Sequence, residues 1–121
     1  MDNVLAARYA SQPMVALWSA ENRIIMEREL WVTVLEIQRD LGIDIDAKAI
    51  EDYRSVIDQV DLGSIRAREA VTRHDVMARL EEFRALAGHE EAHKGMTSRD
   101  LTENVEQVQI RRSLDLILDR V

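Results

Sequence analysis

The chain has 121 residues, of which 46% are hydrophobic and 4% aromatic, and a formal net charge of −7 at pH 7. This length is typical of one domain, and the composition indicates a mostly aliphatic core. The absence of cysteine excludes disulfides and thiolate metal sites, and the acidic charge argues against nucleic acid as a general partner.

The backbone offers few points at which a helix must break, because the chain contains four glycines and one proline. This favours an all-α fold over a turn-rich β fold. No apolar run reaches the roughly 18 residues that a membrane span needs, and the start lacks the pattern of a signal peptide. We therefore expect no membrane contact and a cytoplasmic location.

The N-terminal residues carry weak helical signals. Residues 1–10 show no clear period, so we expect an irregular arm there. Ser11 and Pro13 are suited to starting a short helix that runs to Leu17, since proline fits the first turn of a helix.

Residues 20–41 carry the clearest helical period. Ser19 is a candidate N-cap, and Gly42 is a natural stop. We expect Trp31 in the core. The residues predicted to face inward are Ile24, Ile25, Trp31, Val34, Leu35, Ile37, Gln38 and Leu41.

Two shorter helices are predicted next. Asp46 can cap a helix over residues 47–58, and Asp61 can cap another over residues 62–71. The inward positions of the first are Ile50, Tyr53, Val56 and Ile57.

The S/T-x-x-D/E pattern of a helix start occurs at Thr72 and Asp75. It predicts a helix with His74 in its first turn and Gly88 at its end. Val76, Leu80 and Phe83 would form the inward face of this helix.

The same pattern recurs at Thr97 and Asp100, where the last helix is predicted to begin near Ser98. A helix start presents unpaired N–H groups and the positive end of a dipole, so it can bind an anion. Cationic or potentially cationic residues lie nearby in the sequence: Arg73, His74, His93, Lys94 and Arg99. The capping pattern alone favours an ordinary capped surface helix, whereas the local cluster of cationic residues in an acidic chain points to a small anionic ligand.

The apolar stripe of the last helix continues to the final residue through Leu101, Val105, Val108, Leu114, Ile117, Leu118 and Val121. No glycine, asparagine or proline ends the helix. We therefore expect the chain to be the N-terminal part of a longer protein whose helices continue into a bundle.

Residues 89–93 read HEEAH and match the H-E-x-x-H zinc motif. Gly88 and Gly95 bracket the motif, which argues against a long carrier helix. His74 is the one other histidine and provides no third ligand at a familiar spacing. We predict no metal site here, and hence no metalloprotease.

Two motifs carry a resemblance to a known family. Residues 72–76 (TRHDV) and 93–100 (HKGMTSRD) resemble motifs of the adenylosuccinate lyases, a family of the fumarase/aspartase superfamily. Arg8 and Tyr9, followed by Pro13 and Met14, resemble the N-terminal segment of that family. The likeness runs along essentially the whole chain and assigns His93 to a substrate loop.

The resemblance implies an all-α, homotetrameric enzyme without a cofactor, whose active sites combine residues of three subunits at the ends of a helical bundle. Residues 1–97 would form the N-terminal substrate-contact domain, and residues 98–121 would begin the first long helix of the central bundle. Such enzymes are C–N lyases of purine and AMP biosynthesis. They eliminate fumarate from adenylosuccinate, which gives AMP, and from the succinylated aminoimidazole carboxamide ribotide.

The resemblance also implies roles for individual residues. Arg8 and Tyr9 would bind the nucleotide phosphate, and Arg73, His74 and Asp75 would position the nucleotide and the succinyl group. Thr97 and Ser98 would donate to the carboxylate on which charge develops. His74 would transfer a proton or position the substrate, and His93 would support binding.

The main catalytic serine and a further catalytic histidine of the family are expected beyond Val121, so we expect the isolated chain to bind weakly and not to turn over. Two alternatives remain. One is another lyase of the superfamily, of the argininosuccinate or cycloisomerase type. The other is a non-catalytic helical module that assembles through the stripe of its last helix.

Overall fold

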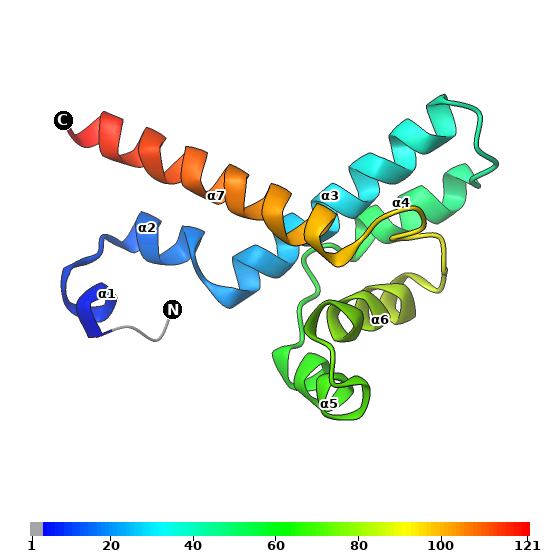
Figure 1. Ribbon diagram of the computed structural model, residues 1–121, viewed down its shortest axis with the longest axis horizontal. Coiled ribbons are helices and arrows are strands. Elements are labelled where there is room, and N and C mark those ends of the chain that lie inside the picture. Colours follow the sequence, from blue (N-terminus) through cyan, green and yellow to red (C-terminus); the bar gives the residue numbers. More distant parts are fainter. Residues whose placement is uncertain (1–3) are drawn as a thin grey trace.

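A computed structural model describes residues 4–121, which form an all-α fold (Figure 1). The helices are α1 (Val4–Tyr9), α2 (Gln12–Leu17), α3 (Ala20–Asp40), α4 (Ala47–Ser55), α5 (Leu62–Thr72), α6 (Asp75–Ala87) and α7 (Ser98–Arg120). No strand occurs among residues 4–121, and none of their helices is both long and apolar enough to span a bilayer. The predicted fold class is confirmed.

Side-chain caps start most of these helices where they were predicted. The caps of α2, α3, α4 and α5 are Ser11, Ser19, Asp46 and Asp61. At the start of α7, Thr97 accepts from the N–H of Asp100 and donates its own N–H to the Asp100 carboxylate. Gly42 follows α3 with φ +97°, a conformation that glycine adopts without steric cost.

The predictions for α1 and for the end of α4 are wrong. Residues 4–9 form helix α1 and not an irregular arm. Helix α4 ends at Ser55 and not at residue 58, because the N–H of Val56 bonds to the carbonyl of Tyr53 and closes a tighter last turn. The carbonyls of Val56, Ile57 and Gln59 accept hydrogen bonds from the side chain of Arg28 in α3.

The buried face of α3 is narrower than predicted. Trp31 and Leu35 are buried, but Ile37 is 52% exposed and Leu41 is 79% exposed. Residues two and six positions after Leu35 lie about 200° and 240° around the helix, on its far side. The prediction that Ile37 and Leu41 face inward is therefore wrong.

Three aromatic rings form the centre of the core. Trp31 stacks on Phe83 with ring centroids 5.8 Å apart, and Tyr53 tilts against Phe83 at 4.7 Å. Aliphatic side chains from α3, α4, α6 and α7 surround the rings, among them Leu35, Ile50, Val76, Leu80 and Leu101. The prediction that Trp31 belongs to the core is confirmed.

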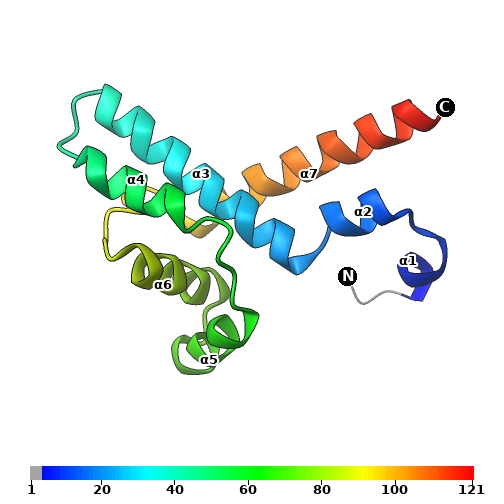
Figure 2. The ribbon, with the colours of Figure 1, turned by 180° about the vertical axis from the view of Figure 1, so that it is seen from behind.

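The helices α3 and α7 connect two ends of an elongated molecule (Figures 1 and 2). At one end, α1 and α2 lie near the C-terminal part of α7, and the indole N–H of Trp18 donates to Ser113 Oγ at 2.8 Å. At the other end, α4, α5 and α6 pack beside α3. Both views place α1 far from α6.

Candidate functional site

The loop between α6 and α7 is held in place by side chains from the surrounding helices. Three of its carbonyl oxygens accept hydrogen bonds: His89 from the Tyr53 hydroxyl at 2.6 Å, Ala92 from Arg84 Nη2 at 2.8 Å, and Lys94 from Gln38 Nε2 at 3.0 Å. The loop is thus irregular in secondary structure but fixed in position, which suits a segment that must present side chains accurately.

His93 is oriented by a hydrogen bond from the core. The indole N–H of Trp31 donates to Nδ1 of His93 at 3.0 Å, so the neutral imidazole carries its proton on Nε2. Burial lowers the pKa of His93, and the positive charge of Arg84 lowers it further. Sequence reasoning assigned Trp31 to the core alone, although a buried indole N–H generally needs an acceptor.

The pH dependence of stability tests this neutral state. The unfolded chain binds the proton near the ordinary histidine pKa of 6.5, and the folded chain binds it at lower pH. Between these two pKa values the unfolded state holds more protons than the folded state. The contribution of neutral His93 to the free energy of unfolding is therefore fully present above about pH 6.5, and it is lost as the pH falls toward the lower folded pKa. Urea unfolding at about pH 7.5 and about pH 5.5 measures this loss.

His93→Asn is the matched variant for this measurement. Asparagine does not titrate, and it tolerates the positive φ of +73° that residue 93 adopts. Titration of other groups is common to both proteins. We expect a smaller loss of stability on acidification in the variant than in the wild type; equal losses would show that His93 is not held neutral.

His74 is the N-cap of α6. Its Nδ1 accepts from the backbone N–H of Met77 at 3.1 Å. The prediction that Thr72 caps this helix, with His74 in the first turn, is wrong. Arg73 adopts the left-handed conformation, with φ +55°, which ends α5 at Thr72 and leaves His74 extended as the residue before α6.

Asp75 begins α6 beside the imidazole of His74. Its Oδ1 accepts from the N–H of Val76 at 2.8 Å and lies 3.9 Å from Nδ1 of His74. Burial alone would raise the pKa of Asp75, but the bond from Val76 and the charge of Arg79 outweigh this effect and hold the pKa below its usual value. Asp75 is therefore a carboxylate at neutral pH.

The two predicted motifs share an unusual backbone feature. Arg73 and His93 are the non-glycine residues with positive φ in the described part of the chain, residues 4–121. Such a conformation costs on the order of 1–3 kcal/mol and concentrates at functional sites. The charges of His74 and Asp100 both act on the pKa of His93, so the starts of α6 and α7 lie within electrostatic range of this loop.

The start of α7 combines donors with a carboxylate. The capping box uses the oxygen of Thr97 as an acceptor and leaves its hydroxyl hydrogen outside these bonds. Ser98 follows in the first turn and is partly buried. Arg99 is exposed and lies 3.1 Å from Glu103, so its charge is already partnered. Thr97 and Ser98 each carry a hydroxyl group that can donate a hydrogen bond at this helix start.

Arg8 and Tyr9 are not brought to the other predicted residues. Both lie at the end of α1 and are exposed, and α1 is at the opposite end of the molecule from α6 (Figures 1 and 2). A site at the starts of α6 and α7 therefore does not include the pair in α1 within one copy of this chain.

The H-E-x-x-H segment does not form a helix, so His89 and His93 do not share a helix face. His89 instead places Nε2 2.7 Å from Oδ2 of Asp52 on α4. The described residues contain no group of three or more His, Cys, Asp or Glu side chains placed to hold a metal ion.

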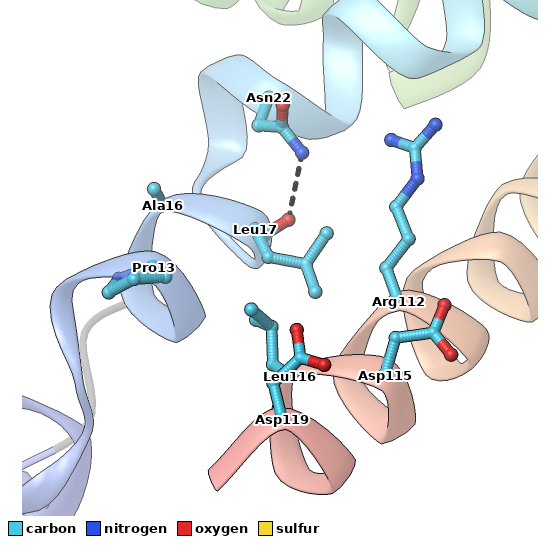
Figure 3. Close-up of a pocket in the computed structure, with 8 residues that line it drawn as sticks. All are labelled: Pro13, Ala16, Leu17, Asn22, Arg112, Asp115, Leu116 and Asp119. Atoms are coloured by element: carbon cyan, nitrogen blue, oxygen red, sulfur yellow. Dashed lines mark hydrogen bonds between the residues drawn. The ribbon is translucent and has the colours of Figure 1, made fainter.

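A pocket of about 380 Å³ lies between α2, the start of α3 and the C-terminal part of α7 (Figure 3). Its lining contains one cation, Arg112, and two carboxylates, Asp115 and Asp119. This charge balance disfavours an anionic ligand. None of the residues predicted to contact substrate lines this pocket.

Comparison with known proteins identifies the relatives of this chain. No family model matches it. It is 37% identical to the adenylosuccinate lyase of Schistosoma mansoni, over 98% of this chain and 25% of the relative. It is 35% identical to that of Saccharomyces cerevisiae, over 97% of this chain and 25% of the relative. The chain is homologous to part of adenylosuccinate lyase.

The resemblance found in the motifs is thereby confirmed. The adenylosuccinate lyase of Caenorhabditis briggsae is 32% identical, over 98% of this chain and 26% of its own length. The chain spans about a quarter of the length of these curated relatives. The similarity covers both the TRHDV and the HKGMTSRD segments, because it extends over nearly all of the chain.

Proposed function

We propose that this chain supplies the N-terminal, substrate-contacting part of an adenylosuccinate lyase. The proposed C–N lyase reaction eliminates fumarate from adenylosuccinate to give AMP, and from the succinylated aminoimidazole carboxamide ribotide in purine biosynthesis. The observation that supports this most directly is that the charges of His74, at the start of α6, and Asp100, in the first turn of α7, both act on His93, in a chain homologous to lyases of that name.

The polar groups of the site suit such an elimination. A base removes a proton from the carbon next to a carboxylate, the C–N bond breaks, and the leaving nitrogen takes up a proton. His74 accepts the cap hydrogen bond through Nδ1, so its neutral form carries the proton on Nε2 and can donate it toward a ligand. Thr97 and Ser98 would donate to the carboxylate on which negative charge develops.

The remaining parts of the proposal concern the whole enzyme. Residues 1–97 would be the substrate-contact domain, and residues 98–121 the beginning of a long helix of the central bundle. The enzyme would be a cytoplasmic homotetramer that uses no cofactor. Arg8 and Tyr9 would bind phosphate in a site completed by another subunit, which accommodates their distance from His74 in a single chain.

Variants of His74 in the full-length enzyme test this function. His74→Ala removes the cap acceptor and the imidazole, whereas His74→Asn keeps a good N-cap and removes the imidazole alone. We expect both variants to lower kcat/KM for adenylosuccinate by at least about tenfold, the usual scale for a residue in proton transfer. The rate of fumarate release, followed with and without EDTA, gives kcat/KM for the wild type and both variants.

The two variants separate chemistry from folding. If kcat/KM falls in His74→Ala but stays at the wild-type value in His74→Asn, His74 serves only as the helix cap. Unchanged kcat/KM in both would remove His74 from the site. Activity on argininosuccinate in place of adenylosuccinate would retain the superfamily and change the substrate.

A further inference from the structure

A buried ion pair lies behind the start of α6. Glu27 of α3 is fully buried, and Arg79 of α6 is 9% exposed. Oε2 of Glu27 accepts from Nη2 of Arg79 at 3.1 Å, and Oε1 lies 2.6 Å from Nε. The carboxylate thus accepts one hydrogen bond, from Nη2, and its other oxygen lies in ion-pair contact with Nε without a well-aligned hydrogen bond.

The third nitrogen of the same guanidinium faces the candidate site. Nη1 of Arg79 lies 3.7 Å from Oδ2 of Asp75, one turn earlier on α6. The other oxygen of Asp75 is bonded to the N–H of Val76 and lies beside His74. A series of polar contacts therefore leads from Glu27 in the core through Arg79 to Asp75, which lies beside the exposed imidazole.

Stability alone is a weak explanation for burying this pair. Removing two charges from water costs free energy, and apolar residues of similar volume are often as stabilising as a buried ion pair. Burial raises the pKa of Glu27, although Arg79 and Arg23 oppose this effect. The charges of Arg79, His74 and Arg23 also act on Asp75. The pair is thus electrostatically linked to the start of α6.

We propose that Glu27 and Arg79 are positioning residues of the candidate site, where they set the direction of the Asp75 carboxylate. This inference rests on the proposed function. Glu27 accepts from Nη2 and lies in ion-pair contact with Nε, and Nη1 stays 3.7 Å from Oδ2 of Asp75, too far for a direct hydrogen bond. Oδ2 of Asp75 is then available to accept a hydrogen bond from substrate.

Glu27→Gln tests this arrangement in the 121-residue chain. Glutamine keeps the shape and one acceptor but removes the charge, so the attraction of Arg79 shifts toward Asp75. We expect the pKa of Asp75, followed by NMR of its side-chain carboxyl carbon, to fall further than in the wild type. We also expect AMP to bind about tenfold more weakly, because Asp75 is drawn away from the ligand.

Glu82→Gln is the matched control. Glu82 is also a buried carboxylate, 4% exposed, and accepts from Nε of Arg68 on α5 at 3.1 Å. It tests the general cost of neutralising a buried glutamate. We expect it to leave both the Asp75 titration and AMP binding unchanged. Equal behaviour of Asp75 in the wild type and both variants would overturn the proposal.

A second variant covers the case in which Glu27→Gln does not fold. Arg79→Lys keeps the positive charge but replaces the fork by a single ammonium group, which we expect to stay with Glu27. The pKa of Asp75 should then rise, the opposite of the first variant, and an unchanged value would contradict the inference. If the wild-type chain binds no AMP, the Asp75 titrations still decide the link, while the fumarate-release assay of the full-length enzyme decides the proposed function.

Discussion

Replacing Leu80 with alanine is expected to lower the free energy of unfolding by about 3 kcal/mol. Leu80 lies on α6, is 1% exposed and belongs to the core cluster around Trp31 and Phe83. Removing its branched end loses buried apolar surface and leaves a cavity that the neighbouring rings cannot fill without leaving their rotamers. The midpoint of thermal unfolding should fall by about 10 °C.

The control is Leu86→Ala on the same helix. The same atoms are removed there, but Leu86 is 36% exposed, so we expect a loss of about 1 kcal/mol or less. Urea unfolding of both variants, analysed with a common m-value, provides the comparison. Equal destabilisation by the two substitutions would mean that α6 does not bury the face that contains Leu80.

A second large effect is expected from Arg28→Met. Arg28 of α3 is buried, and its Nη1 donates to the carbonyls of Val56 at 3.1 Å, Ile57 at 3.1 Å and Gln59 at 3.0 Å. Methionine fills much of the same space without a donor, so these carbonyls lose their charged partner in a buried region. We expect a loss of about 3 kcal/mol.

Arg39→Met is the matched substitution at an exposed position of the same helix, and we expect its effect to stay within about 0.5 kcal/mol. Hydrogen exchange adds a local test, because the amides of residues 56–60 should lose protection in Arg28→Met and keep it in Arg39→Met. A stability of Arg28→Met close to that of the wild type would show that water replaces the guanidinium at these carbonyls.

Local sequence signals were sufficient to predict most helix starts. Ser19, Asp46 and Asp61 act within three residues of their own position, and so do Thr97 and Asp100. The same signals misassigned the start of α6. Both Thr72 and His74 precede this helix as possible N-caps. The left-handed conformation of Arg73, which non-glycine residues rarely adopt, ends α5 and makes His74 the N-cap.

Long-range polar contacts could not be predicted from the sequence. The charged residues Glu27, Arg28 and Arg79 would be expected on the solvent-exposed face of a helix from the spacing of the apolar residues. Their burial depends on partners elsewhere in the chain. The bond from Trp31 to His93 joins residues 62 positions apart. The motifs located the candidate site residues, but spacing along the chain does not show that α1 lies far from α6.

The way in which the loop of residues 89–95 is held also limits how its length can vary. Surface loops usually accept inserted residues, since their ends are fixed and their middle is solvated. Here carbonyls along the loop are bonded to side chains of α3, α4 and α6, so one added residue would displace every bond that follows it. For protein engineering, the exposed turn at residues 41–44 is the better place for an epitope or label.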